Sequence, residues 1–406
     1  MLLSDFLSER VRVGDLHITY TDGRLRAYGD GSGPRVALKL TRKAERALLM
    51  DPHLAIGETY ADGDLVLIEG QYWDLMEIIG RNSLRVGVPR SLVVRSWRAL
   101  RRLWGQRNGR SAAKDNASHH YDLSLALFQR FLDEDLQYSC AYFDKPDMSL
   151  EAAQAAKKAH LGAKLDLSPG QKLLDIGCGW GGLALELAGR HGVEAHGVTL
   201  SEEQWAVAKA RALASGLAGR AQFWLTDYRD VVERFDRIVS VGMLEHVGRP
   251  NLKAYFRHVG RLLEDDGVAV IHAIGNAAGP CDPQPFLQKY IFPGGYIPSL
   301  SEIVAAVEDA GLWINDIEIL RLHYAETLKR WRARFLEQRA DIVSMYDERF
   351  ARMWEAYLCL SELAFRYLKC MVFQIQLTKR VDALPITRDY IYRPNPRNFV
   401  QAVARR

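Results

Sequence analysis

A carboxylate followed by closely spaced glycines is the feature of this sequence that points most directly to chemistry. Asp175 lies at the end of an apolar run and precedes glycines at 177, 179, 181 and 182, and the helical pattern LALELAGRHG follows. Glycine lets the backbone adopt unusual conformations and approach a ligand closely. A strand that ends in such a turn and leads into a helix is typical of sites for bulky cofactors. The alternative is a turn without a ligand, which fits less well because clustered glycines cost backbone entropy.

The elements around this turn alternate between strand and helix. Apolar strand-like runs lie at 172–177, 194–200, 221–227, 235–242 and 267–275, with helical patterns between the first three. This order predicts an α/β fold, a Rossmann-like doubly wound sheet whose strands are mostly parallel. The ends of such strands lie along one edge of the sheet, where ligands bind.

The length of 406 residues predicts more than one domain. We expect a small mixed α/β N-terminal domain over 1–106, a polar linker over 107–120, and a catalytic domain over 121–406 that ends in a helical segment around 324–380. The composition, 48% apolar and 26% charged, is typical of a soluble globular protein.

Several classes of protein are disfavoured by the composition. No uncharged apolar run is long enough to span a bilayer, and the first residues lack the basic and apolar regions of a signal peptide. The five cysteines are scattered and form no CxxC pair, which argues against a disulfide framework and against a metal site and indicates a reducing cytoplasm.

A basic stretch spans the end of the expected N-terminal domain and the start of the linker, and we expect that domain to associate with lipid or membrane. Residues 85–114 contain nine basic residues and no acidic one, and Val93, Trp97, Leu100 and Trp104 would fall along one stripe of a helix. Such a helix suits the surface of an anionic membrane. A solvated helix that packs its stripe on its own protein is an equally good interpretation. Nucleic-acid binding explains the interleaved tryptophans less well than a membrane does.

The second strand indicates which cofactor the turn would hold. Nicotinamide enzymes often end this strand with an acidic residue that binds the ribose, whereas here Thr199 stands at that position. The segment LDIGCGWG at 174–181 resembles motif I of S-adenosylmethionine-dependent methyltransferases, which are class I Rossmann-like enzymes. Asp227, after the third strand, stands where such enzymes often bind adenine, although it would also serve as a helix N-cap.

Further segments resemble the cyclopropane-fatty-acyl-phospholipid synthase family and its mycolic acid cyclopropane synthase relatives. They are HHYDLS (119–124), LQYSCAYFD (136–144), GVTLSEEQ (197–204), SVGMLEHVG (240–248), IHAIG (271–275) and YIFPGGYIPS (290–299). The combination is far more specific than the glycine motif alone. The resemblance implies a cofactor site formed by Tyr138, Ser139, Leu173, Leu174, Asp175, Ile176, Gly177, Cys178, Gly179, Trp180, Gly181, Thr199, Leu200, Gln204, Tyr228 and Arg229, to which we add Asp227.

The same resemblance implies a reaction on the double bond of an acyl chain in a membrane phospholipid. The alkene takes the methyl group of S-adenosylmethionine, and loss of a proton from that methyl closes a cyclopropane ring. In this family a bound bicarbonate ion accepts the proton. The residues that bind this ion correspond here to Cys140, Glu245, His272, Ile274 through its backbone, and Tyr324. Because a carboxylate beside bicarbonate is repulsive, either these two share a proton or His272 is charged.

Each of these residues also has a purely structural interpretation. Glu245 would cap a helix, His272 would be a satisfied core histidine, and Cys140 would be a small buried residue. Cys359 matches a cysteine that has been considered an active-site residue in the family, but its apolar helical surroundings favour core packing.

Rival functions remain open at the level of the sequence. The nearest is a methyltransferase that leaves a methyl branch or methylene group on the same lipid, and more distant ones are methylation of a soluble small molecule and a non-catalytic lipid-binding protein. The resemblance further implies a homodimer. The cysteine pattern predicts a cytoplasmic protein, and the basic stretch predicts peripheral association with the inner face of the membrane.

Overall fold

The computed structural model describes residues 3–83 and 124–392 of the chain. The chain folds into two compact units, each assembled from separate stretches of sequence. The small-sheet unit comprises Met1–Leu103, Asp282–Pro293 and Ala325–Cys370. The large-sheet unit comprises Trp104–Cys281, Gly294–Tyr324 and Met371–Arg406.

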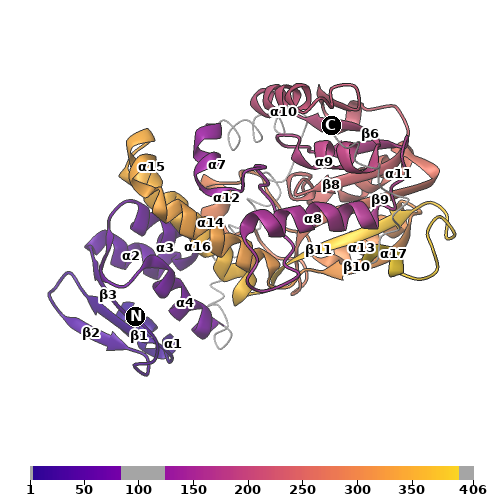
Figure 1. Ribbon diagram of the computed structural model, residues 1–406. Helices are drawn as coiled ribbons and strands as arrows, with labels where there is room; N and C mark the ends of the chain where they lie inside the picture. Colours follow the sequence, from indigo (N-terminus) through magenta and orange to yellow (C-terminus); the bar gives the residue numbers. More distant parts are fainter. Residues whose placement is uncertain (1–2, 84–123, 393–406) are drawn as a thin grey trace. The chain divides into compact units, whose positions relative to one another are not determined.

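The small-sheet unit is built on a four-stranded sheet of order β2-β1-β3-β4 (Figure 1). β1 and β3 are parallel, and the other two pairs are antiparallel. Its N-terminal elements are α1 (Leu3–Arg10), β1 (Asp15–Thr19), β2 (Leu25–Tyr28), β3 (Arg35–Leu40), α2 (Arg42–Met50), α3 (Pro52–Ala61), β4 (Leu65–Glu69) and α4 (Tyr72–Ser83). The mixed α/β character expected for this region is therefore confirmed.

Helices from late in the sequence complete the small-sheet unit. They are α12 (Pro285–Tyr290), α14 (His323–Glu337), α15 (Arg339–Met345) and α16 (Glu348–Arg366). α16 packs on α3 and α4, and a Cβ atom on Gly80 of α4 would lie only 2.8 Å from Cδ1 of Leu363 of α16. The sequence pattern predicts that these helices belong to the catalytic domain, whereas their contacts group them with the N-terminal sheet. The expected boundaries at 106 and 107–120 lie outside the described residues.

The large-sheet unit carries a seven-stranded sheet of order β10-β11-β9-β8-β5-β6-β7. β7, β6, β5, β8 and β9 are parallel to their neighbours in this series, and β10 and β11 are antiparallel. Its strands are β5 (Lys172–Ile176), β6 (Glu194–Thr199), β7 (Ala221–Leu225), β8 (Phe235–Val241), β9 (Leu263–Asn276), β10 (Trp313–Ile319) and β11 (Cys370–Thr378). The predicted doubly wound, mostly parallel sheet is confirmed.

Helices cover both faces of this sheet, and each face has its own apolar core. One core joins the strands to α11 (Leu252–Leu262) and α13 (Leu300–Asp309), and the other joins them to α8 (Leu150–Lys164), α9 (Gly182–His191) and α10 (Glu202–Ala214). The remaining elements are α7 (Leu125–Phe131), α17 (Asp389–Tyr392) and the 3₁₀ helices η1 (Tyr228–Asp230), η2 (Leu244–His246) and η3 (Arg249–Asn251).

The expectation of a wholly helical segment over 324–380 is wrong at its end. β11 occupies Cys370–Thr378, and all but its first residue are buried. Apolar and polar residues alternate over 373–378 (FQIQLT), which is the pattern of a strand, so the helical interpretation overlooked a local signal. Across 3–83 and 124–392, no helix is both long and apolar enough to cross a membrane.

Candidate active site

The glycine turn between β5 and α9 has the geometry that its composition predicts. Gly177, Gly179 and Gly181 have φ angles of 81°, 55° and 82°, in the left-handed region that favours glycine. A Cβ atom on Gly181 would lie 2.7 Å from Cζ of Phe223, so the turn packs tightly against β7 on that side. A Cβ atom on Gly179 would meet nothing within 4 Å. The turn thus leaves open space beside Gly179, where a ligand can approach the backbone.

Asp175 points to a ligand at the same place. Its side chain is buried, and Oδ2 has no hydrogen-bond partner among the described residues. Burial raises the pKa of this carboxyl group to about 7. A buried polar atom without a partner costs free energy, and such a cost is recovered when a ligand supplies the missing donor.

The other predicted residues of the turn contribute in different ways. Leu173, Leu174 and Ile176 lie in the two cores, so only their backbones remain for a ligand. Cys178 is buried, and desolvation raises the pKa of its thiol well above the ordinary value. The indole of Trp180 packs 5.1 Å from the ring of Phe128, and its Nε1 has no hydrogen-bond partner in the described structure.

Thr199, Leu200 and Gln204 surround the carboxyl end of β6. The Thr199 hydroxyl donates to Oε1 of Gln204 at 2.9 Å and accepts from the backbone N–H of Ser201 at 3.2 Å. Ser201 in turn caps α10. Leu200, which stands between Thr199 and Ser201 in the sequence, is half-buried. This small network fixes the strand end that neighbours the glycine turn in the sheet.

Asp227, Tyr228 and Arg229 follow β7. The carboxylate of Asp227 accepts the backbone N–H of Arg229 at 2.9 Å and its Nε–H at 2.8 Å, so Asp227 caps η1, as its alternative interpretation predicts. Tyr228 packs edge-on against Tyr255 at 5.6 Å, and burial raises its pKa to about 12. Asp227 is therefore satisfied within the protein, in contrast to Asp175.

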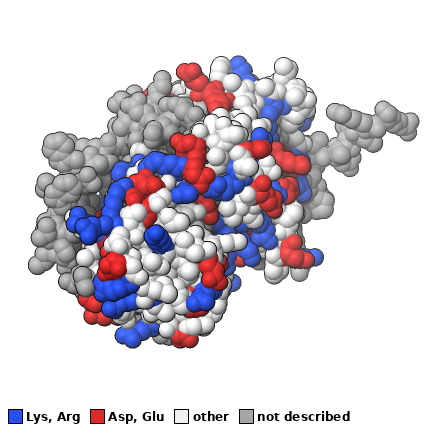
Figure 2. Space-filling view, turned by 90° about the vertical axis from the view of Figure 1, so that its left-hand side faces the viewer, with Lys and Arg blue, Asp and Glu red and all other residues white. Residues whose placement is uncertain are grey.

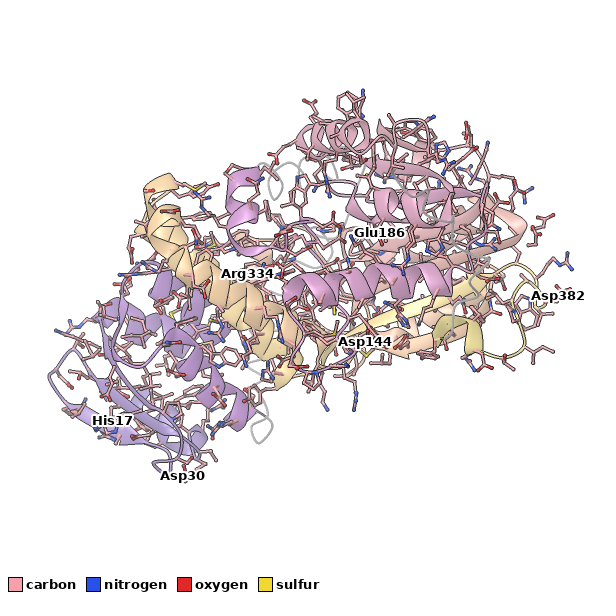
Figure 3. All side chains as sticks on the ribbon, viewed as in Figure 1. His17, Asp30, Asp144, Glu186, Arg334 and Asp382 are labelled. Atoms are coloured by element: carbon pink, nitrogen blue, oxygen red, sulfur yellow. The ribbon has the colours of Figure 1, made fainter. Side chains whose placement is uncertain are left out.

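Tyr138, Ser139 and Cys140 lie on the loop that leads into α8, and that helix holds the loop in place. Gln154 donates to the backbone oxygens of Gln137 and Ser139 at 3.1 and 2.9 Å. Lys158 pairs with Asp135 at 2.6 Å and lies 4.0 Å from Glu186 of α9, which Figure 3 labels. The ring of Tyr138 packs edge-on against Phe128 at 5.1 Å.

Lys157 is a residue of this region that the sequence reasoning missed. Its ammonium group is buried and donates to Oε1 of Gln137 at 2.5 Å and to Oγ of Ser139 at 2.9 Å. A signal was present, because Leu150, Ala153, Lys157, Leu161 and Lys164 recur at helical spacing, which places two lysines on the apolar face of α8.

Glu245 and Ile274 meet beside the ends of β8 and β9. The backbone N–H of Ile274 donates to Oε1 of Glu245 at 2.6 Å, while Oε2 is buried without a partner in the described structure. Burial raises the pKa of Glu245 to about 7. Glu245 lies within η2, whose N-cap is Met243, so the helix-cap interpretation of Glu245 is wrong.

His272 lies on β9 opposite Val241 of β8. Burial lowers its pKa to about 3, and the positive charges of Lys157 and Lys164 add to this effect. Nε2 of Gln374 lies 3.1 Å from Nδ1 of His272. Because an amide nitrogen donates, Nδ1 accepts and Nε2 carries the proton of the neutral ring.

The segments that carry Cys140 and Tyr324 contact each other through residues next to these two. Cys140 is buried, and its charge interaction with Lys157 places it near that ammonium group. Two residues on, Tyr142 stacks on His323 at 4.9 Å between ring centroids, and His323 accepts the backbone N–H of Phe143 at 2.9 Å. Tyr324 follows His323 at the start of α14 and is half-buried.

Cys359 belongs to the small-sheet unit, whereas the other candidate residues belong to the large-sheet unit. It is fully buried on α16, and desolvation raises the pKa of its thiol well above the ordinary value. Such a thiol stays protonated and is a poor nucleophile. The structure therefore favours core packing for Cys359.

Comparisons with known proteins agree with this geometry. Residues 108–375 match the model of the mycolic acid cyclopropane synthetase family, and residues 2–86 match a domain of unknown function, DUF7884. A probable fatty acid methyltransferase of Pseudomonas putida is 40% identical over 288 residues, covering 68% of this chain and 73% of the relative. The cyclopropane-fatty-acyl-phospholipid synthase of Escherichia coli strain K12 is 38% identical over 343 residues, covering 83% of this chain and 86% of the relative.

A solved structure shares its fold with about two thirds of this chain. The crystal structure of mycolic acid cyclopropane synthase CmaA1 complexed with SAH and CTAB is 32% identical, with a TM-score of 0.62, and covers 65% of this chain and 97% of that one. The glycine turn, the sheet order and these matches have one common explanation. The chain belongs to the mycolic acid cyclopropane synthetase family and is an S-adenosylmethionine-dependent methyltransferase that modifies lipids.

Proposed function

We propose that this enzyme adds a methylene group across the double bond of an unsaturated acyl chain in a membrane phospholipid and closes a cyclopropane ring. The observation that carries the proposal is the state of Glu245. Its carboxyl group is buried, is oriented by the N–H of Ile274, and keeps one oxygen without a partner in the described structure. The resemblance to the named synthase of Escherichia coli supports the choice of substrate.

The residues of the turn fit the cofactor. S-adenosylmethionine supplies an electrophilic methyl group. The open side of Gly179 admits a ligand to the backbone, and Oδ2 of Asp175 offers an acceptor to a donor of that ligand. Tyr138, Ser139, Thr199, Leu200, Gln204, Tyr228 and Arg229, with the backbone of 173–181, would complete the site.

In the first chemical step, the π electrons of the alkene form a carbon–carbon bond to the methyl group while its bond to sulfur breaks. A carbocation remains on the acyl chain. Removal of a proton from the new methyl group releases the electron pair that closes the ring. The enzyme must therefore exclude water from the carbocation and hold a base close to the methyl group.

We propose that Cys140, Glu245, His272, Ile274 and Tyr324 hold a bicarbonate ion that serves as this base. An anion beside a carboxylate requires a shared proton or a charged histidine. A pKa of about 7 for Glu245 and of about 3 for His272 favours the first arrangement. Neutral His272 would donate from Nε2, and Glu245 would share its proton with the anion.

The test uses the full-length protein with S-adenosylmethionine and vesicles of an unsaturated phospholipid. We expect the acyl chains to gain one CH₂ and to resist ozonolysis, because a ring replaces the double bond. Omission of bicarbonate from degassed buffer should slow turnover, and its addition should restore it. Vesicles whose lipid mass does not change would refute the proposed function.

A second product is favoured by the relative from Pseudomonas putida, whose name specifies methyl transfer to a fatty acid. A methylene or methyl-branched alkene would show the same gain of CH₂ but would still be cleaved by ozone. The ozonolysis of the product therefore distinguishes ring closure from methyl transfer without ring closure.

We further propose that the protein is a cytoplasmic homodimer that associates peripherally with the inner, anionic face of the membrane. The basic stretch at 85–114 lies outside the described residues. On the face drawn in Figure 2, the described basic and acidic side chains are interspersed. Membrane attraction through 85–114 predicts vesicle binding that weakens as salt rises, because salt screens the charge. Flotation with vesicles and light scattering test the two proposals.

A further inference from the structure

The buried ammonium group of Lys157 is an unusual feature of the large-sheet unit. Its side chain has no solvent-exposed area, and its hydrogen-bond partners are the neutral oxygens of Gln137 and Ser139. The neighbouring lysines of α8 differ, because Lys158 pairs with Asp135 and Lys164 pairs with Asp316 and Glu318. Within 3–83 and 124–392, no carboxylate lies within 4.0 Å of the Lys157 ammonium. Burial of a cation without an ion pair is costly, which favours a role in binding.

The loop that contacts Lys157 cannot easily move away from it. Gln154, one turn earlier on α8, holds the backbone oxygens of Gln137 and Ser139. Leu136 has a φ of 59°, so the loop turns sharply just before these residues. The distance of 2.9 Å between Nζ of Lys157 and Oγ of Ser139 is therefore fixed from both sides.

This contact decides the direction of the Ser139 hydroxyl. A hydroxyl has one hydrogen and two lone pairs, and here a lone pair is occupied by the hydrogen bond from Lys157. An ammonium cannot accept, so the hydrogen of Ser139 must point elsewhere, and accepting a hydrogen bond from a positive group makes this hydroxyl a stronger donor. Ser139 is thus oriented as a donor to a ligand acceptor.

We propose that Lys157 is a positioning residue for the cofactor, which orients Ser139 to donate to the carboxylate of the amino-acid end of S-adenosylmethionine. The inference rests on the proposed role of Ser139 in binding the cofactor. The carboxylate is the only anionic group of this ligand, whose ammonium and sulfonium groups are positive. The charge of Lys157 therefore also selects which end of the ligand lies at this loop.

The charge of Lys157 gives the proposal a measurable pH dependence. The groups that act on it are Asp133, Asp135 and Cys140 of the loop, Lys158 of its own helix, Asp175 of β5 and His272 of β9. Desolvation is the largest cause and lowers the pKa of Lys157 to about 8. The ammonium is therefore charged at neutral pH and loses its charge as the pH rises through about 8.

The experiment compares two ligands by titration calorimetry on the full-length protein: S-adenosylmethionine, and decarboxylated S-adenosylmethionine, which lacks the carboxylate. For Lys157→Met we expect the dissociation constant of the first ligand to rise roughly tenfold or more, as for the loss of a charge-assisted hydrogen bond. The second ligand should bind both proteins about equally. Lys157→Arg keeps the charge and should recover part of the loss.

The pH series supplies a readout that a purely structural role would not change. The ratio of the dissociation constants of Lys157→Met and wild type should be large near pH 7 and should approach one above the pKa of Lys157. Because both proteins see the same ligand, titration of the ligand itself cancels in this ratio. Circular dichroism establishes that each variant folds, and the wild-type comparison of the two ligands needs no variant.

Each outcome separates this inference from the proposed function. If wild type binds neither ligand, the proposed function fails. If wild type binds S-adenosylmethionine and Lys157→Met binds it equally well, or loses affinity for both ligands to the same extent at every pH, the inference is overturned while the proposed function stands.

Discussion

The two units of the protein bury carboxyl groups in opposite ways. In the small-sheet unit, Glu362 is almost inaccessible and receives hydrogen bonds from Arg332 and Arg366, and Glu355 accepts from the hydroxyl of Tyr60 at 2.8 Å. In the large-sheet unit, Glu245 and Asp175 are also buried, yet each keeps one oxygen without a partner in the described structure. The two units differ in what compensates the free-energy cost of burying a carboxyl group.

In the first unit, neighbouring side chains compensate the cost of burial, so the carboxylates contribute to the fold. In the second unit the cost remains in the protein alone, and a ligand is needed to supply the missing donors. Burial raises the pKa of all four carboxyl groups, but Glu245 and Asp175, whose values rise to about 7, form no salt bridge with the described residues. Buried groups with shifted pKa values and no partner are therefore the better guide to function.

The largest expected effect is on turnover. Glu245→Gln keeps an oxygen for the N–H of Ile274 but cannot share a proton with a bound anion. We expect turnover to fall by about 10²–10⁴-fold, the usual range for a group in proton transfer. Cofactor affinity should stay near the wild-type value, as calorimetry will show.

Glu355→Gln is the matched control for this variant, because Gln also accepts from Tyr60. Its turnover should resemble that of wild type. Equal turnover of Glu245→Gln and wild type would remove Glu245 from the mechanism, and equal losses in both variants would break the contrast between the units.

The next effect is on stability. Glu362→Gln removes the ion-pair partner of Arg332, whereas Arg366 keeps Glu326 at 2.9 Å, and we expect a loss of about 3 kcal/mol in the free energy of unfolding. Urea denaturation followed by circular dichroism measures it. The same measurement on Glu245→Gln should show little loss, since Glu245 has no buried cation as a partner. A larger loss for Glu245→Gln would reverse the comparison.

The pH dependence of stability sharpens the contrast. The pKa of Glu245 in the folded protein, about 7, exceeds its ordinary value of 4.5, so the folded protein retains a proton that the unfolded chain releases. The contribution of Glu245 to the free energy of unfolding is therefore fully present below pH 4.5 and is lost as the pH rises to about 7. The pKa of His272 is lowered from 6.5 to about 3, so the contribution of this residue to stability increases as the pH rises between these two values.

Because His272 is common to both proteins, the difference between wild type and Glu245→Gln isolates the glutamate. Between about pH 5 and about pH 7.5, wild type should lose on the order of 2 kcal/mol relative to the variant. Parallel stability curves for the two proteins would show that Glu245 is ionised at neutral pH.

Substitutions at two glycines of the turn distinguish a role in ligand contact from a role in packing. Gly179→Ala places a methyl group in open space at a positive φ, so we expect a folded protein, a cost of about 1 kcal/mol and a roughly tenfold loss of cofactor affinity. Gly181→Ala places its methyl group against Phe223 and Ala208, so its main effect should be on thermal stability. Normal cofactor binding by Gly179→Ala would mean that the ligand does not approach this side of the turn.

The smallest effect is expected at Cys359. Its buried, protonated thiol packs within the small-sheet unit, so Cys359→Ala should keep most activity and lose about 1 kcal/mol of stability. An inactive but normally folded Cys359→Ala protein would assign this residue to the site after all.

Much of the large-sheet unit could be predicted because its signals are local. The strands that end at Ile176, Thr199 and Val241 are short apolar runs bounded by glycine or polar residues, and the turn at 177–182 carries its own conformational signature. The residues expected at the sheet edge could be found from motif positions alone.

What could not be predicted depends on contacts between distant parts of the chain. The environment of Lys157 is set by Gln137 and Ser139, whose positions depend in turn on Gln154. Similarly, α16 packs on an N-terminal helix, and 295 residues separate the two members of the Tyr60–Glu355 pair.

The position of β11 has a consequence for biosynthesis. This strand, among the last described elements of the chain, inserts between β10 and β9, which are made earlier. While the ribosome is still translating α14 to α16, the nascent chain holds β9 and β10 without the strand that joins them. The sheet cannot close until Thr378 has emerged from the exit tunnel. Chains truncated before β11 would leave β9 and β10 without the neighbour that they share, so such chains should be substrates for chaperones and proteases.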